Sequence, residues 1–292
     1  MSVQRLTSTC VSCVAKANLD KHPVDITEQQ KIEYMQRMLS IVANAKSTDS
    51  APLIVHKIDQ LRTELFGAST DFTEIKRYFN DYVMQKECRI LADIDSAEDS
   101  LLRGLQYSMT GNYIDFGALA NVSEDKFEEL LLKAKEIYLD TEEYEALKKH
   151  LSGAKRLVVL HDNCGEIVFD HLLIKTLKKL YPELQITSMV RGFPVLNDAT
   201  MDDAEQIGLT KTVNVIGNGT NIAGTCMDEI SKEALEILEA ADVIISKGQG
   251  NFETLYGCGL NIYYLFMCKC TMFANRFKKN LYEGMLLNDK NV

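Results

Sequence analysis

The apolar residues of roughly the first 145 positions recur at the spacing of α-helices, and no segment there alternates as a half-buried strand would. Between positions 27 and 45, for example, Ile32, Met35, Leu39 and Val42 fall on one helical face. The pattern predicts helices over 27–45, 51–66, 71–90 and 95–107, a turn at 110–112, and a further helix from 123 to about 134. The first half of the chain is therefore expected to be all-helical.

From about Lys155 the pattern changes to short β-branched, uncharged runs that alternate with amphipathic segments. The pattern predicts strands over 156–161, 185–190, 211–216, 243–246 and 262–268, with helices over 166–180, 200–207 and 231–241. Repeated strand–helix units of this kind form a mostly parallel, doubly wound (Rossmann-like) α/β sheet. We expect an all-helical N-terminal domain over 1–150 that caps an α/β domain over 151–292.

Composition narrows the classes of partner. The 292 residues are 46% hydrophobic and carry a net charge of −10, with no long basic tract, which disfavours a nucleic-acid partner. No apolar stretch approaches the ~18–20 residues that span a bilayer, and the N-terminus lacks the apolar core of a signal peptide. We expect a cytoplasmic protein with no membrane or nucleic-acid partner; oligomeric state has no sequence signal.

Polar side chains follow each of the first four predicted strands. Asp162, Asn163 and Glu166 follow the first, and Arg191 and Asp198 follow the second. The third strand is followed by the turn Gly217-Asn218-Gly219 and the fourth by Lys247-Gly248-Gln249-Gly250-Asn251. Because the carboxyl ends of parallel strands meet at one edge of a sheet, these side chains are expected to lie close together.

The grouped side chains have the chemistry of a metal–phosphate site. Asp162, Asn163 and Asp198 offer the oxygen ligands that suit Mg²⁺ or Mn²⁺. Glycine-rich turns expose backbone N–H groups to an anion, and Lys247 can reach a phosphate. Taken singly, each feature also has an ordinary structural interpretation: aspartates as helix caps, the glycines as a turn, the lysine as a surface residue.

The segment Asp162-Asn163-Cys164-Gly165-Glu166 resembles the Asp-Asn-x-Gly-Glu signature of the DUF89 family of metal-dependent damage-control phosphatases. Other segments resemble the family in the same order along the chain: 111–117, Arg191-Gly192 with Asn197-Asp198, and 247–253. The resemblance extends over nearly the whole chain, so it carries more weight than a single motif.

The resemblance implies roles for individual residues. Asp162, Asn163 and Asp198 would bind a divalent metal, which would be Mn, Mg, Co or Ni. Asp162, Lys247 and Glu166 would be catalytic, with Lys247 on the substrate phosphate and Glu166 orienting the first turn or a water. The substrate-binding set would be Asn112, Asp115, Arg191, Gly217, Asn218, Gly219, Lys247 and Asn251.

The eight cysteines do not suggest a disulfide scaffold in a chain of this length. Cys10 and Cys13 form one Cys-x-x-Cys pair, which alone is weak evidence for a metal. With Cys270 the pair resembles cysteines of the prokaryotic-type branch of the family. A second metal, a redox cluster and plain packing all stay open.

The resemblance implies hydrolysis of phosphate monoesters of small metabolites, such as sugar phosphates or nucleotide-related compounds. Direct attack by water is favoured over attack by Asp162, because a carboxylate bound to metal is a poor nucleophile. Two other functions fit the sheet and the glycine turns: an S-adenosylmethionine-dependent methyltransferase and a non-catalytic metabolite- or nucleotide-binding module. Neither gives the Asp162, Asn163 and Asp198 set an obvious purpose.

Overall fold

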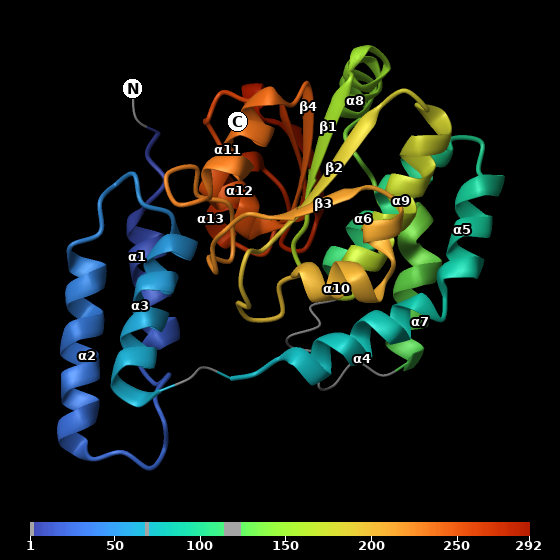
Figure 1. Cartoon of the computed structure of the whole chain (residues 1–292). Coiled ribbons are helices and arrows are strands. Elements are labelled where there is room, and N and C mark those ends of the chain that lie inside the picture. The colour runs from blue at the N-terminus through green and yellow to red at the C-terminus, as the bar shows by residue number, and fades with distance from the viewer. Residues whose placement is uncertain (1–2, 68–69, 114–123) are drawn as a thin grey trace.

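The computed structural model describes residues 3–67, 70–113 and 124–292 (Figure 1). Its centre is one six-stranded sheet in the order β3-β2-β1-β4-β5-β6. The strands are β1 (Arg156–Leu160), β2 (Gln185–Val190), β3 (Asn214–Gly217), β4 (Val243–Lys247), β5 (Ile262–Met267) and β6 (Gly284–Asn288). The first five pair in parallel and β6 pairs antiparallel with β5. The predicted mostly parallel α/β fold is confirmed.

Helices cover both faces of the sheet. All residues of β4 and β5 are buried, as expected for strands with a helix layer on each side. On one face, Leu157 and Val159 of β1 share a core with α9 (Glu166–Leu180); on the other, Val158 and Leu160 pack with the second layer. That layer, visible in Figure 1, comprises α11 (Lys232–Ala240), α12 (Gln249–Leu255) and α13 (Thr271–Phe277).

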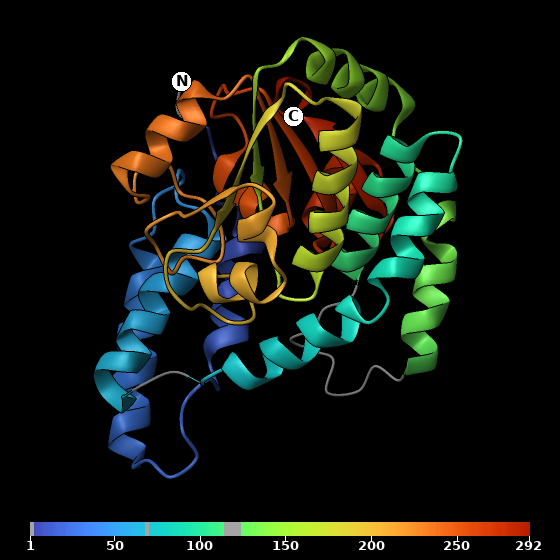
Figure 2. The same ribbon diagram turned by 45° about the vertical axis from the view of Figure 1, so that its right-hand side comes forward.

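The N-terminal helices fall into two groups by their packing. The first three have a core of their own around Tyr34, Met38 and Ile58, and both views show them beside the sheet layers (Figure 2). Helices of the second group share the core of the α9 face. The groups are α1 (Ser8–Asn18), α2 (Glu28–Ala43) and α3 (Ala51–Phe66), then α4 (Thr73–Met84), α5 (Glu87–Ser96), α6 (Ser100–Tyr113), α7 (Glu124–Lys133) and α8 (Thr141–Gly153). A domain division at residue 150 stays a prediction.

Two predicted helices are wrong in extent. The single helix over 71–90 is two helices, because the chain turns at Gln85 and Lys86 between α4 and α5. The helix over 95–107 is instead α6, which starts at Ser100 and continues through the predicted turn at 110–112. Gly111 is there for close packing: a Cβ on it would lie 3.0 Å from Phe169 of α9. The glycine that suggested a turn is a helix–helix contact.

The remaining differences concern the bounds of two elements and several elements that were not predicted. Helix α10 (Met201–Gln206) forms within the predicted 200–207, whereas β3 starts three residues later than expected because Leu209–Lys211 form a 3₁₀ turn. The sequence pattern gave no separate indication of α1, α8, α12, α13 or β6. Within the described residues, no helix is both long enough and apolar enough to cross a membrane.

Candidate active site

The first predicted loops meet at the carboxyl ends of β1 and β2. A backbone bridge joins Asn163 to Asp198, with Cys164 N donating to the Asn197 carbonyl (2.8 Å) and Ala199 N to the Asp162 carbonyl (2.8 Å). The strand order reverses between β1 and β4, which is where open α/β sheets bind ligands. The structure therefore brings Asp162, Asn163 and Asp198 together at the expected edge.

Arg191 holds the two carboxylates of these loops. Its Nε donates to Asp198 Oδ2 at 2.7 Å, and its Nη2 lies 3.4 Å from Asp162 Oδ1. Its Nη1 donates to Asn251 Oδ1 at 2.9 Å, and Asn251 in turn donates to the carbonyl of His161. We call Arg191, Asp162 and Asp198 the Arg191 cluster. Its three members come from the loops that follow β1 and β2. Asn251 of α12 holds the guanidinium group of Arg191 in place.

One arginine does not compensate the two carboxylates of the Arg191 cluster. Burial, followed by the charges of Glu166 and Asp198, raises the pKa of Asp162 to about 8, and the opposing effect of Arg191 is smaller. Burial also raises the pKa of Asp198, although its contact with Arg191 opposes the shift. The Asp162 side chain remains 14% exposed. The cluster is thus short of positive charge at a point that solvent reaches.

This donor set fits a hard divalent cation. Asp162 and Asp198 supply carboxylate oxygens and Asn163 an amide oxygen, the ligand types that Mg²⁺ and Mn²⁺ prefer. Among the residues that the structure describes, no group of three or more His, Cys, Asp or Glu side chains could hold a metal ion. A cation here would consequently rely on two carboxylates and an amide, with other positions left to water and substrate.

Lys247 lies in a second, closed cluster. Its Nζ contacts Glu166 Oε1 at 2.6 Å, Asp170 Oδ1 at 3.0 Å and the Ser108 carbonyl at 2.8 Å, and all three charged side chains are 0% exposed. Burial alone would lower the pKa of Lys247, but the carboxylates raise it above its usual value. An ammonium has three N–H donors, so all of them are used. We call Lys247, Glu166 and Asp170 the Lys247 cluster; its lysine is not a surface residue.

Sequence reasoning missed Asp170. It lies one helical turn after Glu166 on α9, accepts from Ser108 Oγ at 2.6 Å and lies 2.9 Å from His161 Nδ1. Burial would raise the pKa of Asp170, but Lys247 and His161 lower it below its usual value. The sequence did carry a signal for Asp170: Glu166 and Asp170 are two acids four residues apart on an otherwise apolar helix face, which indicates a buried polar cluster.

Asn112 connects the two clusters. Its Nδ2 lies 3.1 Å from Glu166 Oε2 and 3.4 Å from Asp162 Oδ2, and its Oδ1 accepts from Met267 N at 2.8 Å. Asn163 Nδ2 also donates to Glu166, at 3.1 Å. The helical half of the chain thus contributes a buried side chain to the site. Asp115, the other expected contribution, lies outside the described residues.

The glycine-rich turns pack closely against other parts of the site. Gly248, at φ +80°, faces Asp162: a Cβ on it would lie 2.0 Å from Asp162 Oδ2. Gly219, at φ +83°, lies against Gly192. A Cβ on Gly192 would lie 2.4 Å from Gly219 N. Asn218 Oδ1 accepts from Gly192 N at 2.9 Å. Gly217, Asn218 and Gly219 therefore join the β3 turn to the β2 loop, and their contact with substrate stays a prediction.

Buried polar side chains of α4 support the loops that follow β1 and β2. Asn80 of α4 accepts from Gly165 N at 2.7 Å and donates to Asp203 at 2.9 Å. Lys76 lies 2.7 Å from Asp203 Oδ2 and donates to Thr200 at 3.2 Å. This contact set was not predicted, because only the tertiary arrangement brings α4 to the sheet edge.

The cysteines do not form a ligand group. Cys10, Cys13 and Cys270 are all free thiols, and Cys10 Sγ lies 3.2 Å from Thr7 Oγ1 within α1 and its cap. Cys10 packs against the core of the first three helices, whereas Cys270 packs against the α11–α13 layer. A metal or redox role for them stays a prediction without geometric support.

Comparisons with known proteins find relatives over most of the chain. The chain is 31% identical over 242 residues to a damage-control phosphatase of Pyrococcus horikoshii, covering 78% of this chain and 83% of that protein. A damage-control phosphatase of Archaeoglobus fulgidus is 29% identical over 284 residues, covering 95% and 96%. The crystal structure of a DUF89 family protein from Pyrococcus horikoshii matches with a TM-score of 0.79 at 26% identity, covering 97% of this chain and 99% of that one.

The family assignment follows from coverage. Residues 6–285 match the damage-control phosphatase ARMT1-like domain, which is nearly the whole chain. The fold match to a DUF89 protein extends over the same length and confirms the resemblance seen in the Asp-Asn-x-Gly-Glu motif. The chain therefore belongs to the damage-control phosphatase ARMT1-like (DUF89) family.

Proposed function

We propose that this protein is a divalent-metal-dependent phosphatase that hydrolyses phosphate monoesters of small metabolites, such as sugar phosphates or nucleotide-related compounds. The Arg191 cluster is the observation that carries the proposal: two carboxylates short of positive charge lie beside an amide at the switch point of the sheet. Membership of a family whose phosphatases are metal-dependent in general supports it.

Asp162, Asn163 and Asp198 would hold the metal, which we propose to be Mn, Mg, Co or Ni. A divalent cation supplies charge that neutralises phosphate and acidifies a water. Arg191 fixes the orientation of both carboxylates through its contacts at 2.7 and 3.4 Å. Water oxygen forms the new bond to phosphorus while the ester oxygen leaves with a proton, which gives an alcohol and inorganic phosphate.

Glu166 and Lys247 would act from beneath the site. Glu166 accepts hydrogen bonds from the side-chain amides of Asn112 and Asn163. It therefore orients the Asn163 side chain beside Asp162. Lys247 neutralises part of the negative charge of Glu166 and Asp170 and so holds Glu166 in place. Direct contact between Lys247 and phosphate requires one of its three present acceptors to give way, because all its N–H donors are engaged.

The eight free cysteines favour a cytoplasmic location, which we also propose, because reducing compartments keep thiols unpaired. Small phosphorylated metabolites are the proposed partners.

Phosphate release from a panel of monoesters tests the function. Wild type is expected to release phosphate with Mn²⁺, Co²⁺, Ni²⁺ or Mg²⁺ and to lose this activity in EDTA. Asp162→Ala should be inactive, whereas Asp228→Ala, at an exposed carboxylate of the β3–α11 connection, should equal wild type. Equal rates for wild type and Asp162→Ala would refute a phosphatase with this site. Activity that survives EDTA would refute the metal requirement.

A further inference from the structure

One helix of the N-terminal half contacts both segments that carry the proposed metal ligands. Asn80 of α4 accepts a hydrogen bond from Gly165 N at 2.7 Å, and its amide donates to Asp203 Oδ1 at 2.9 Å. Gly165 lies two residues after Asn163 in the loop that follows β1. Asp203 lies in the first turn of α10, five residues after Asp198. A single buried side chain thus bonds to both ligand-bearing segments.

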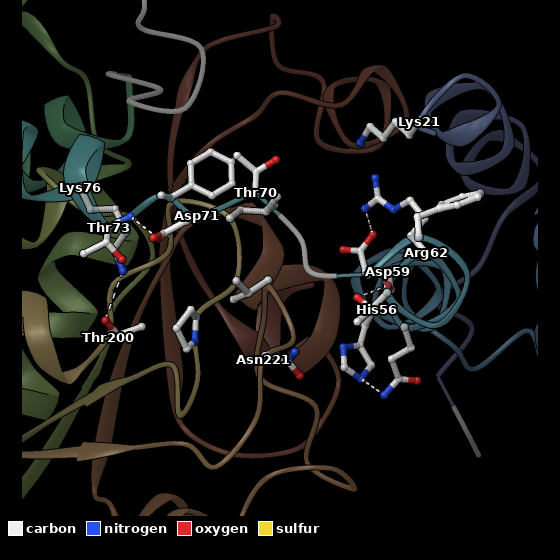
Figure 3. Close-up of a pocket in the computed structure, with 18 of the residues that line it drawn as sticks. Lys21, His56, Asp59, Arg62, Thr70, Asp71, Thr73, Lys76, Thr200 and Asn221 are labelled. Carbon is white, nitrogen blue, oxygen red and sulfur yellow. Dashed lines mark hydrogen bonds and ion pairs between the residues drawn. The ribbon is translucent and has the colours of Figure 1, made fainter. Parts of the chain in front are cut away.

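On the β2 side, Asp203 fixes the residue that begins α10. Thr200 N and Thr200 Oγ1 both donate to Asp203 Oδ2 at 2.8 Å, and Lys76 Nζ lies 2.7 Å from the same oxygen. Figure 3 shows Lys76 and Thr200 joined by a hydrogen bond of 3.2 Å at one wall of the pocket that α3 and α4 line. Thr200 also pairs with Arg191 in a backbone bridge, and Asp198 lies two residues before it. The contacts of Asp203 therefore hold the end of the loop that carries Asp198.

On the β1 side, Asn80 supplies the acceptor for a backbone N–H at the start of a helix. Gly165 has φ +68° and is the N-cap of α9, and an N-terminal N–H group of this kind has no acceptor within the helix. Asn163 belongs to the same turn, because its carbonyl accepts from Ile167 N at 3.1 Å. Without the Asn80 oxygen, a buried N–H would lose its acceptor, which is costly enough to shift the turn. The Asn163 amide would move with it.

Helix α4 is anchored to the protein independently of these loops. Its residues Phe79 and Val83 are buried in the core that α9 shares. Lys76 and Asn80 are four residues apart and so lie on one face of the helix, where Asn80 is 0% exposed. Because packing fixes α4, the helix gives both loops a common point of reference.

We propose that Asn80 is a positioning residue for the metal, and that its bonds to both loops set the spacing between Asn163 and Asp198. The inference rests on the proposed function, because it takes Asp162, Asn163 and Asp198 as the ligands. A site for a cation such as Mg²⁺ needs its ligands held to within about 0.5 Å. Loss of groups that orient metal ligands typically weakens metal affinity by about 10- to 100-fold.

Three variants and a control test this. Asn80→Ala removes both hydrogen bonds, and Asn80→Ser keeps a hydroxyl that is too short to reach both partners. The double variant Asn80→Asp with Asp203→Asn exchanges the amide and the carboxylate. Residue 80 still accepts from Gly165 N, the bond between residues 80 and 203 only reverses its direction, and the total charge beside Lys76 is unchanged. Asn275→Ala, at an exposed position of α13, is the matched control.

Calorimetric titration with Mn²⁺ alone measures the metal affinity of each protein, and urea denaturation in EDTA measures its stability without metal. We expect Asn80→Ala and Asn80→Ser to bind Mn²⁺ about tenfold or more weakly than wild type. The double variant should return to within about threefold of wild type, and Asn275→Ala should equal it. A purely structural role for Asn80 predicts lower urea midpoints with unchanged Mn²⁺ affinity.

Wild-type Mn²⁺ affinity in folded Asn80→Ala or Asn80→Ser would overturn the positioning role and leave the proposed metal site intact. A folded double variant that binds Mn²⁺ at least tenfold more weakly than wild type would also overturn it, because both contacts are present there, and this result decides even where the single variants do not fold. If wild type itself does not bind Mn²⁺, the proposed function fails and this inference fails with it.

Discussion

The Lys247 and Arg191 clusters contain the same formal charges, one cation and two carboxylates, but differ in how those charges are compensated. In the Lys247 cluster the contacts are 2.6 and 3.0 Å, every charged side chain is 0% exposed, and the pKa of Asp170 is lowered. In the Arg191 cluster one contact is 2.7 Å and the other 3.4 Å, and the pKa of Asp162 rises to about 8. At the same charge count the two clusters thus differ in burial and contact geometry, which is why we propose the Arg191 cluster as the cation site.

The difference indicates a division of labour. A closed, fully hydrogen-bonded cluster contributes to the fold and to the orientation of its neighbours, whereas an open cluster with uncompensated carboxylates is suited to binding. Asn112 contacts Asp162 of the Arg191 cluster and Glu166 of the Lys247 cluster, so one side chain joins the two clusters. Substitutions that separate stability from activity can therefore break or sharpen the comparison.

The largest expected effect is on stability, at the closed cluster. Lys247→Met leaves two buried carboxylates without their cation, which should lower the free energy of unfolding by about 3–5 kcal/mol. Urea denaturation followed by circular dichroism measures the loss. Lys232→Met, at a side chain that is 90% exposed, is the control and should change stability by less than about 0.5 kcal/mol. A loss at Lys247 no greater than at Lys232 would mean that the closed cluster is not structural.

The open cluster should show the opposite behaviour. Asp198→Asn keeps an acceptor for Arg191 but removes a proposed metal ligand, so phosphate release should fall by about 100-fold or more. Its free energy of unfolding should not fall, because burial of that charge is already unfavourable. Initial rates and urea midpoints are the two measurements, with Asp228→Asn as the control. Loss of stability without loss of activity would reverse the assigned roles.

Metal binding separates the clusters without an activity assay. Mn²⁺ at about 100 times its dissociation constant should stabilise wild type by about 2.7 kcal/mol relative to EDTA. Asp198→Asn should lose that gain, whereas Asp170→Asn, in the closed cluster, should keep it. Thermal denaturation with and without the metal measures both. An equal gain in all three proteins would place the metal elsewhere.

The sheet edge could be predicted from sequence because its signals are local. Each signal is visible in a short window: one β-branched run is followed by Asp162 and Asn163, and a second by Arg191 and Asp198. Parallel pairing of the two strands then brings their carboxyl ends to the same edge of the sheet. These residues consequently appear where the pattern placed them.

The site features that could not be predicted from the sequence depend on contacts between segments far apart in the chain. Asp170 gains its place from Lys247, 77 positions later, and Asn80 supports Gly165 only because α4 crosses the sheet edge. Gly111 was interpreted as a turn because glycine usually ends helices, yet here it allows α6 to approach Phe169. The burial of Lys247 likewise follows from packing by α6 and α9, which no local pattern encodes.

The smallest expected effect is in the acid range. The pKa of Asp170 in the folded protein lies below its ordinary 3.8, so its ionised form contributes stability above that value and loses the contribution as pH falls through the folded pKa. Wild type should therefore lose stability below pH 3.8 more steeply than Asp170→Asn, which has no proton to gain there. Lys247, His161 and Ser108 face this carboxylate.

Urea midpoints between about pH 2.5 and 6 measure this difference. Asp25→Asn, at an exposed carboxylate in the α1–α2 connection, should follow the wild-type curve. Parallel curves for wild type and Asp170→Asn would show that the carboxylate of the closed cluster is no better compensated than an ordinary one. The contrast with the Arg191 cluster would then rest on exposure alone. A steeper wild-type curve ties the contrast to the groups that contact Asp170, with Lys247 the largest contributor and His161 and Ser108 adding to it.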